Sequence, residues 1–184
     1  MVNDDMPERV LLVGFMASGK SSTGKELASR LGWDFQDFDT VIAARAGKSV
    51  SRIFSEDGEA EFRRLESGVA EDLLARSNTV VASGGGWPAQ PGAWKMVAEN
   101  TMSIWLKVSL AVAVRRASEQ GPTRPLLDGE GVTEQAAVLL LGREAAYSGA
   151  RYSLDSEQYG PPELADEILK LMEREPDPKA KKKK

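Results

Sequence analysis

The chain has 184 residues, with 24 Lys and Arg against 28 Asp and Glu, and it contains neither Cys nor His. This length predicts about one domain, with a core large enough to fold without disulfides. The missing Cys and His exclude disulfide-rich folds, thiolate metal sites and catalytic triads that use histidine, and they leave Mg²⁺ as the kind of metal ion to expect.

Strand-like and helix-like stretches alternate along the chain. Short apolar or β-branched runs predict strands, and apolar residues three or four apart predict helices. Residues 101–114 alternate throughout and also fit one long strand, but Ser109 is a good helix cap, so we place a strand before it and a helix after it. The predicted strands are 10–13, 33–39, 79–82, 101–107 and 152–155, and the predicted helices are 19–31, 38–46, 49–54, 59–76, 93–99, 110–119, 132–147 and 162–172.

This order of elements favours an α/β fold, with a parallel sheet and helices on both of its faces. Ligands in such folds bind beyond the carboxyl ends of the strands, so the residues that follow each strand are the candidates for function. Residues 121–131 hold two Pro and three Gly and predict a mobile loop.

The net charge of −4 hides an acidic body, because five lysines lie in the last six residues, 179–184. An acidic body argues against nucleic-acid binding, which needs a basic face. We predict a single domain over residues 1–172 and a disordered basic tail over residues 173–184, which either keeps the chain soluble or binds a polyanion or membrane surface.

Neither a targeting segment nor a membrane segment is evident near the amino end. Residues 1–9 carry Asp4, Asp5 and Glu8 in place of a basic region, and the apolar run at 10–13 is too short for a signal peptide. No apolar stretch approaches the ~20 residues that a membrane helix needs. We therefore expect a soluble, cytoplasmic protein with no membrane partner.

A glycine-rich loop follows the first predicted strand. Residues Gly14 to Ser21 read GFMASGKS and fit the pattern G-x-x-x-x-G-K-[ST] between a buried strand and an amphipathic helix. Glycines let such a loop turn its N–H groups toward phosphates, while Lys20 can reach the outer phosphates and Ser21 can bind Mg²⁺. The alternative is a glycine-rich turn without a ligand, which this context disfavours.

Two acids follow the second predicted strand. Residues two apart in a strand point to the same side, so we expect Asp37 and Asp39 to project together. A nearby Mg²⁺ or cationic group would relieve their mutual repulsion. Taken alone they could equally be two solvated loop acids, but the neighbouring phosphate loop favours a functional role.

With these residues and four further motifs, the chain resembles the shikimate kinases. The motifs occur in the family's order and near its spacing, from about residue 10 to residue 171. They are Gly14–Ser21, Asp37-Phe38-Asp39, Asp57-Gly58-Glu59 with Glu61-Phe62-Arg63-Arg64, Gly84–Gly86, Arg124-Pro125-Leu126-Leu127, and Arg143 with Tyr147.

The resemblance implies a P-loop NTPase-like three-layer sandwich similar to the nucleoside monophosphate kinases: a five-stranded parallel sheet between helices, with a lid at about 119–131. It implies a monomeric enzyme that transfers phosphate from ATP, with Mg²⁺, to the 3-hydroxyl of shikimate on the route to chorismate and the aromatic amino acids.

The resemblance also implies roles for individual residues. The catalytic residues would be Lys20, Asp39 and Arg124. Contacts to ATP would come from Gly14, Ala17, Ser18, Gly19, Lys20, Ser21, Ser22, Arg116, Arg124 and Tyr159. Shikimate would contact Asp39, Phe54, Phe62, Arg63, Gly84, Gly85, Gly86 and Arg143, and Mg²⁺ would be held by Ser21 and Asp37.

Physical chemistry supports the substrate assignment, because a guanidinium matches a carboxylate with two parallel hydrogen bonds. Arg63 alone could instead form an ordinary surface ion pair with Glu59, four residues earlier. A kinase for another hydroxy acid, such as gluconate, would also need a carboxylate clamp. A non-catalytic nucleotide-binding module is a further alternative, but it predicts the loss of Lys20 or Arg124, and both are present.

Five positions depart from the family's pattern. Ala17 replaces a glycine of the phosphate loop, which is tolerable only if its φ is negative. Trp87 replaces a small residue after the triple glycine, where a large ring could reshape the acceptor pocket. Tyr159 replaces a basic residue beside the adenine and could stack on it, and Ala145-Ala146 replaces Pro-Leu.

Overall fold

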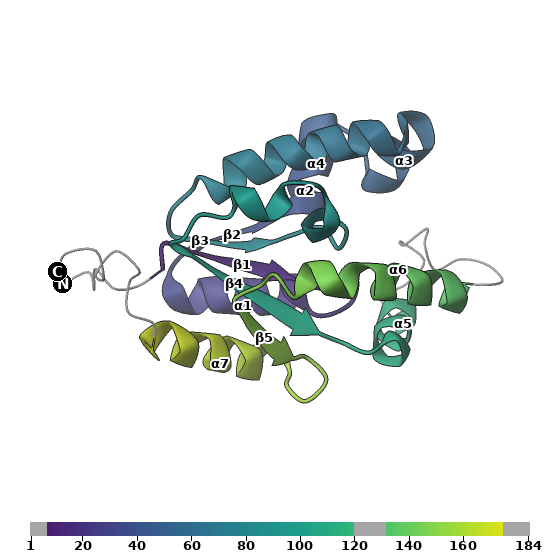
Figure 1. Ribbon diagram of the computed structural model, residues 1–184. Coiled ribbons are helices and arrows are strands. Elements are labelled where there is room, and N and C mark those ends of the chain that lie inside the picture. Colours follow the sequence, from purple (N-terminus) through teal and green to yellow (C-terminus); the bar gives the residue numbers. More distant parts are fainter. Residues whose placement is uncertain (1–6, 120–131, 175–184) are drawn as a thin grey trace.

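A computed structural model describes residues 7–119 and 132–174 of the chain (Figure 1). Five parallel strands form one sheet in the order β2-β3-β1-β4-β5. The strands are β1 (Arg9–Val13), β2 (Asp34–Asp37), β3 (Thr79–Ala82), β4 (Thr101–Lys107) and β5 (Tyr152–Asp155). The helices are α1 (Lys20–Leu31), α2 (Phe38–Ala46), α3 (Val50–Glu56), α4 (Gly58–Leu74), α5 (Leu110–Glu119), α6 (Val132–Tyr147) and α7 (Pro161–Arg174), with 3₁₀ turns η1 (Trp87–Ala89) and η2 (Ala93–Met96).

Two hydrophobic cores lie on opposite faces of the sheet. Successive side chains of a strand point to opposite faces, so Leu11 and Val13 of β1 enter one core and Val10 and Leu12 enter the other. Helices α1 and α7 cover the second core, while α2, α4 and α6 lie over the first (Figure 1). This is the predicted three-layer α/β arrangement, and β1 at its centre is buried along its whole length.

Most predicted elements are confirmed, and two are wrong. The strand predicted at 33–39 stops at Asp37, because this residue caps α2 with its side chain and thereby starts a helix. The helix predicted at 93–99 is only the short 3₁₀ turn η2, which Val97 ends in an extended conformation. Helix α7 continues to Arg174, two residues into the predicted tail.

Two predicted segments fall mostly or wholly outside the residues that the structure describes. These are the lid at 119–131, except for Glu119, and the tail beyond Arg174. Within residues 7–119 and 132–174, the helices are all too short or too polar to cross a lipid bilayer.

A buried arginine ties strands together at the amino edge of the sheet. The Arg9 guanidinium donates to the Arg76 carbonyl at 2.8 Å, to Asn100 Oδ1 at 2.8 Å and to Thr101 Oγ1 at 3.0 Å. These bonds join the beginning of β1 to the segments that lead into β3 and β4. Arg9 thus holds these segments together at the amino edge, whereas the carboxyl edge carries the predicted site residues.

Candidate active site

The predicted phosphate loop lies between β1 and the first turn of α1. Lys20 Nζ donates to the carbonyls of Gly14 at 2.9 Å and Phe15 at 2.8 Å, which holds the ammonium group against the loop. Gly14 has a φ of 147°, and a Cβ there would lie 2.6 Å from the Leu106 carbonyl oxygen. Glycine is therefore required where the loop passes β4. The N-terminus of α1 behind it presents backbone N–H groups to an anion.

Two hydroxyl groups of this region are buried without a partner. Ser18 Oγ and Thr23 Oγ1 make no hydrogen bond to any described residue. Ser22, by contrast, is exposed at the start of α1.

Ala17 adopts a left-handed conformation, with a φ of 56°. The expectation of a negative φ at this position is wrong. The loop imposes on Ala17 the backbone shape that a glycine adopts without cost, and a left-handed alanine carries about 1 kcal/mol of strain.

We expect Ala17→Gly to leave the free energy of unfolding nearly unchanged. Relief of about 1 kcal/mol of strain offsets the extra entropy that glycine gains in the unfolded chain. Ala44→Gly, on the exposed face of α2, is the matched control and should cost about 1 kcal/mol. Urea unfolding of the three proteins measures both values, and equal losses in the two variants would contradict the strain at Ala17.

Ser21 and Asp37 form a hydroxyl–carboxylate pair beside the loop. Ser21 Oγ donates to Asp37 Oδ2 at 2.6 Å, and Asp37 Oδ1 accepts from the N–H groups of Asp39 at 3.0 Å and Thr40 at 3.4 Å. Asp39 therefore does not project from the same strand as Asp37, as the sequence predicted. It lies in the first turn of α2, and its exposed carboxylate reaches the triple glycine instead.

The triple glycine follows β3 and lies against three parts of the site. A Cβ at Gly84 would be 3.7 Å from Asp39 Oδ1, and one at Gly85 would be 3.7 Å from the Gly14 carbonyl oxygen. A Cβ at Gly86 would be 3.1 Å from Arg63 Nη2 and 3.2 Å from Arg143 Nη2. The segment thus has a carboxylate at one end, two guanidinium groups at the other and the phosphate loop beside its middle.

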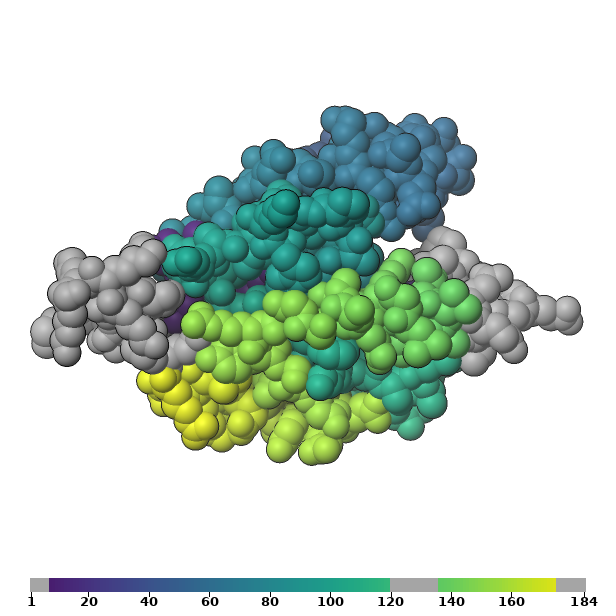
Figure 2. Space-filling view, in the orientation of Figure 1, coloured from purple at the N-terminus to yellow at the C-terminus, as the bar shows by residue number. Residues whose placement is uncertain are grey.

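Arg63 and Arg143 converge on Gly86 from α4 and α6. The ordinary surface pair of Arg63 with Glu59 does form, at 3.1 Å, but Nη1 also donates to buried Glu66 at 2.7 Å. The two helices lie on either side of an indentation of the surface, with α4 in blue and α6 in green (Figure 2). A Cβ at Gly85 would lie 3.8 Å from Arg143 Nη1 and 3.7 Å from the Gly14 carbonyl oxygen, so Arg143 lies beside the phosphate loop.

An aromatic pair adjoins Arg63 on the helices α3 and α4. The rings of Phe54 and Phe62 are 4.5 Å apart, and the Arg63 guanidinium lies 5.3 Å from the Phe62 ring centre. Phe62 is buried, whereas Phe54 is 40% exposed, so Phe54 leaves apolar surface available at the edge of the site.

Glu66 is a residue of the site that sequence reasoning missed. It is 1% exposed, its Oε2 accepts from Arg63, and its Oε1 has no partner among the described residues. A Cβ at Gly84 would collide with Oε1, so a larger residue there would displace the Glu66 carboxylate. Burial raises the pKa of Glu66, and Arg63 only partly opposes the shift. The available signal was a Glu that interrupts the apolar stripe of α4 between Phe62 and Val69.

Replacement of Glu66 by Gln should change how stability depends on pH. Because its pKa is raised in the folded state, Glu66 stabilises the fold most below the unfolded pKa of about 4.3, and this contribution is lost as the pH rises through the folded pKa. The free energy of unfolding of Glu66→Gln, relative to the parent, should therefore increase as the pH rises from about 4 to 7. Urea unfolding at a series of pH values measures it.

Glu61 on the same helix provides the control. Its hydrogen bond with Arg64 lowers its pKa, so Glu61→Gln should show a smaller change of opposite sign. A relative stability of Glu66→Gln that is flat across this pH range would argue against a raised pKa.

Tyr147 links α6 to the triple glycine and also escaped prediction as a site residue. Its hydroxyl donates to the Gly85 carbonyl at 2.6 Å. Burial raises the pKa of Tyr147 to about 12. The hydroxyl therefore keeps its proton near neutral pH and holds Gly85 in place.

The residues predicted to contact adenine, Arg116 and Tyr159, lie near the carboxyl end of β5. Arg116 donates to the Ser156 carbonyl at 2.6 Å and to Ser156 Oγ at 3.3 Å, which places it beside the segment that contains Tyr159. Tyr159 is 40% exposed. Arg124 lies outside the described residues.

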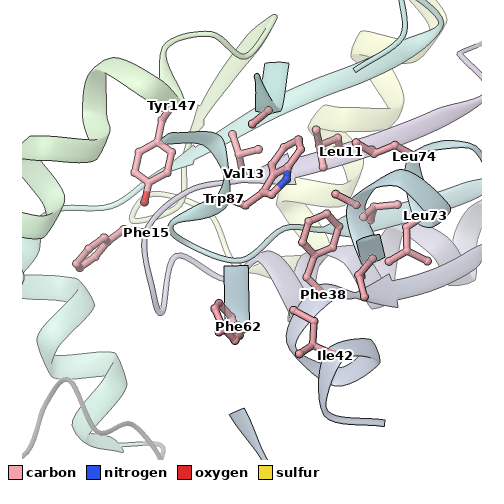
Figure 3. Close-up of a cluster of buried hydrophobic side chains, with 14 of the residues drawn as sticks. Leu11, Val13, Phe15, Phe38, Ile42, Phe62, Leu73, Leu74, Trp87 and Tyr147 are labelled. Carbon is pink, nitrogen blue, oxygen red and sulfur yellow. The ribbon is translucent and has the colours of Figure 1, made fainter. Parts of the chain in front are cut away.

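The Trp87 side chain does not project into solvent at the candidate site. The side chain is 2% exposed and packs edge-on against Phe38, with ring centres 5.5 Å apart (Figure 3). The ring is enclosed by the hydrophobic core, so Trp87 can affect the acceptor pocket only through the residues it packs against.

The comparisons with known proteins agree with this geometry. The family model described as shikimate kinase matches residues 16–173. A shikimate kinase of Synechococcus sp. (strain CC9902) is 37% identical over 163 residues, which cover 89% of this chain and 85% of the relative. The structure of a shikimate kinase from Acinetobacter baumannii in complex with shikimate has a TM-score of 0.84 and 31% identity, and covers 89% of this chain and 92% of its own.

Kinases of other substrates share the fold at a greater distance. A gluconokinase from Sinorhizobium meliloti 1021 has a TM-score of 0.60 and 18% identity over 92% of this chain and 96% of its own. That likeness concerns the fold alone. The matched family model and the relatives above show that the chain belongs to the shikimate kinase family.

Proposed function

We propose that this chain transfers the γ-phosphoryl group of ATP to the 3-hydroxyl of shikimate, giving shikimate 3-phosphate for the synthesis of chorismate. One observation carries the proposal: Arg63 and Arg143 converge on Gly86, while Asp39 lies against Gly84 at the other end of the same segment. Shikimate has a carboxylate at one end of a small ring and hydroxyls at the other. The arrangement of charges complements that of the acceptor.

Each end of the acceptor has a partner of suitable chemistry. The two guanidinium groups bind the carboxylate through charge-assisted hydrogen bonds, and Glu66 holds Arg63 toward the triple glycine. Asp39 accepts the hydrogen bond of the attacking hydroxyl and orients its oxygen in line with the phosphoryl group. A loose transition state asks little of a base, so Asp39 acts chiefly as an orienting group that collects the proton late.

The donor lies on the phosphate loop. Backbone N–H groups at the start of α1 and the ammonium group of Lys20 stabilise charge that develops on the transferred phosphoryl oxygens. Lys20 rests on the Gly14 and Phe15 carbonyls, within the loop that would surround the phosphates. Arg124, by its place in the motif, would add a further positive charge from the lid, and closure of the lid would exclude water.

A magnesium ion fits the pair formed by Ser21 and Asp37. Their oxygens lie 2.6 Å apart, and the described residues contain no cluster of three or more His, Cys, Asp or Glu. Ser21 would bind the ion directly through its hydroxyl oxygen, Asp37 would support it through water, and phosphates and water would occupy the other positions, as Mg²⁺ prefers. When bound, the ion would neutralise charge on the phosphates.

The same proposal includes the setting of the enzyme. We infer a monomer in the cytoplasm that acts on small molecules rather than on nucleic acid or membranes. The acidic body of the chain argues against a nucleic-acid or membrane partner, since it would repel a polyanion or an anionic surface.

The test is release of ADP from ATP and Mg²⁺ with shikimate, quinate, gluconate or no acceptor, measured side by side. Release that depends on shikimate supports the proposal. Lys20→Met, which removes the ammonium group, is the negative control for contaminating ATPases. Release that only gluconate stimulates would overturn the choice of substrate, and release that no acceptor changes would favour a nucleotide-binding module or hydrolase.

A further inference from the structure

Three aromatic side chains form a row beneath the triple glycine. Trp87, the residue after Gly86, packs edge-on against Phe38 at 5.5 Å and 75° (Figure 3). The ring of Trp87 also lies 6.4 Å from that of Trp94, at 53°. We call Phe38, Trp87 and Trp94 the aromatic row.

Trp94 at the end of this row is fixed to the last turn of α6. Its Nε1 donates to the Ala146 carbonyl at 2.9 Å. A Cβ at Gly149 would lie 2.8 Å from Trp94 Cε2, so only a glycine leaves room for the indole ring. The ring is thus held by a hydrogen bond and by close packing against the chain that leaves α6.

The two ends of the row lie next to the two ends of the acceptor site. Phe38 stands between Asp37 and Asp39 at the start of α2. Ala146, which accepts the indole hydrogen bond, is three residues from Arg143 on α6. The row therefore connects the helix that carries the carboxylate to the helix that carries one of the guanidinium groups.

We propose that Trp87 and Trp94 are positioning residues that set the separation between Asp39 and Arg143, and thereby the fit of the acceptor. The inference rests on the proposed function. A displacement of about 1 Å in a substrate-positioning group can cost about a hundredfold in rate. Rigid rings transmit position well, because they have only two side-chain torsions to adjust.

Lys20 of the phosphate loop lies outside this connection, because it is held by carbonyls of its own loop. Ser21 bonds to Asp37 at the Phe38 end of the row, and this contact does not involve a tryptophan. Loss of the row should consequently weaken recognition of the acceptor and leave recognition of ATP unchanged. A merely structural role would affect both substrates together.

Trp94→Phe provides the sharpest test, because it keeps a ring and removes only the indole N–H. We expect the KM for shikimate to rise roughly three- to tenfold, as for loss of one buried hydrogen bond, with the KM for ATP unchanged. Trp87→Phe keeps an aromatic ring in the core and should also raise the KM for shikimate selectively. Trp33→Phe, in the other hydrophobic core, is the matched control and should change neither constant.

Thermal unfolding of each variant shows whether it is folded under the assay conditions. A KM for shikimate that stays within twofold of the parent in both Trp94→Phe and Trp87→Phe would overturn this inference alone, as would an equal rise in both KM values. A parent protein that shows no activity with shikimate would overturn the proposed function, and this inference with it.

Discussion

Replacement of Asp39 by Asn should lower turnover with shikimate by two to three orders of magnitude, within the range of about 10² to 10⁴ for positioned proton acceptors. The carboxylate lies at the Gly84 end of the triple glycine, opposite the arginines, where the acceptor hydroxyl is expected. An amide of the same shape keeps the volume, but it cannot take the proton and aligns the hydroxyl differently. The loss should appear in kcat more than in the KM for ATP.

Asp34→Asn is the matched control. Asp34 is an exposed acid at the start of β2, at the other end of the strand that leads to α2. Steady-state kinetics with both substrates should show parent-like values for this variant. If Asp39→Asn also keeps kcat within a few-fold of the parent, the role assigned to Asp39 is wrong.

Replacement of Arg143 by Gln should raise the KM for shikimate by about a hundredfold, because it removes one half of the carboxylate clamp and leaves the substrate charge under-compensated. The ion pair between Arg63 and Glu66 stays intact, so the fold should tolerate the change. Since the Arg143 guanidinium also lies against Gly85 and Gly86, some loss of kcat is expected through the triple glycine.

Arg64→Gln tests whether any arginine on a neighbouring helix would give the same result. The Arg64 side chain is 70% exposed and pairs with Glu61 on the outer side of α4. Its loss should leave the KM for shikimate unchanged. A similar KM for Arg143→Gln and Arg64→Gln, measured with ATP saturating, would show that Arg143 does not bind the carboxylate.

Much of the fold could be predicted from the sequence because local and global signals agree. The apolar runs that become β1, β3 and β4 are strand-like in isolation and are buried on both faces in the sheet. Glycines that end α1 and α2 in left-handed conformations gave their boundaries directly. The order of the strands then places the phosphate loop and the triple glycine at one edge.

The parts that could not be predicted depend on competition between local structures or on distant contacts. Asp37 fits both a strand and a helix cap, and only the structure shows that capping ends β2 before Asp39. In the sequence, Glu66 is an acid that interrupts an apolar stripe. Its contacts with Arg63 and Gly84, which explain its burial, are visible only in the structure. The loop imposes a left-handed backbone conformation on Ala17 that alanine by itself disfavours. The glycine that the family usually has at this position was the available signal for that conformation.

Arg9 lies at the amino edge of the sheet, on the side away from the candidate active site. Strand β1 begins and α7 ends on this side of the molecule, whereas the strands point their carboxyl ends toward the opposite side (Figure 1). Attachment of the enzyme to a biosensor chip or resin through either terminus should therefore leave the carboxyl edge of the sheet, and with it the candidate active site, facing the solution that contains both substrates.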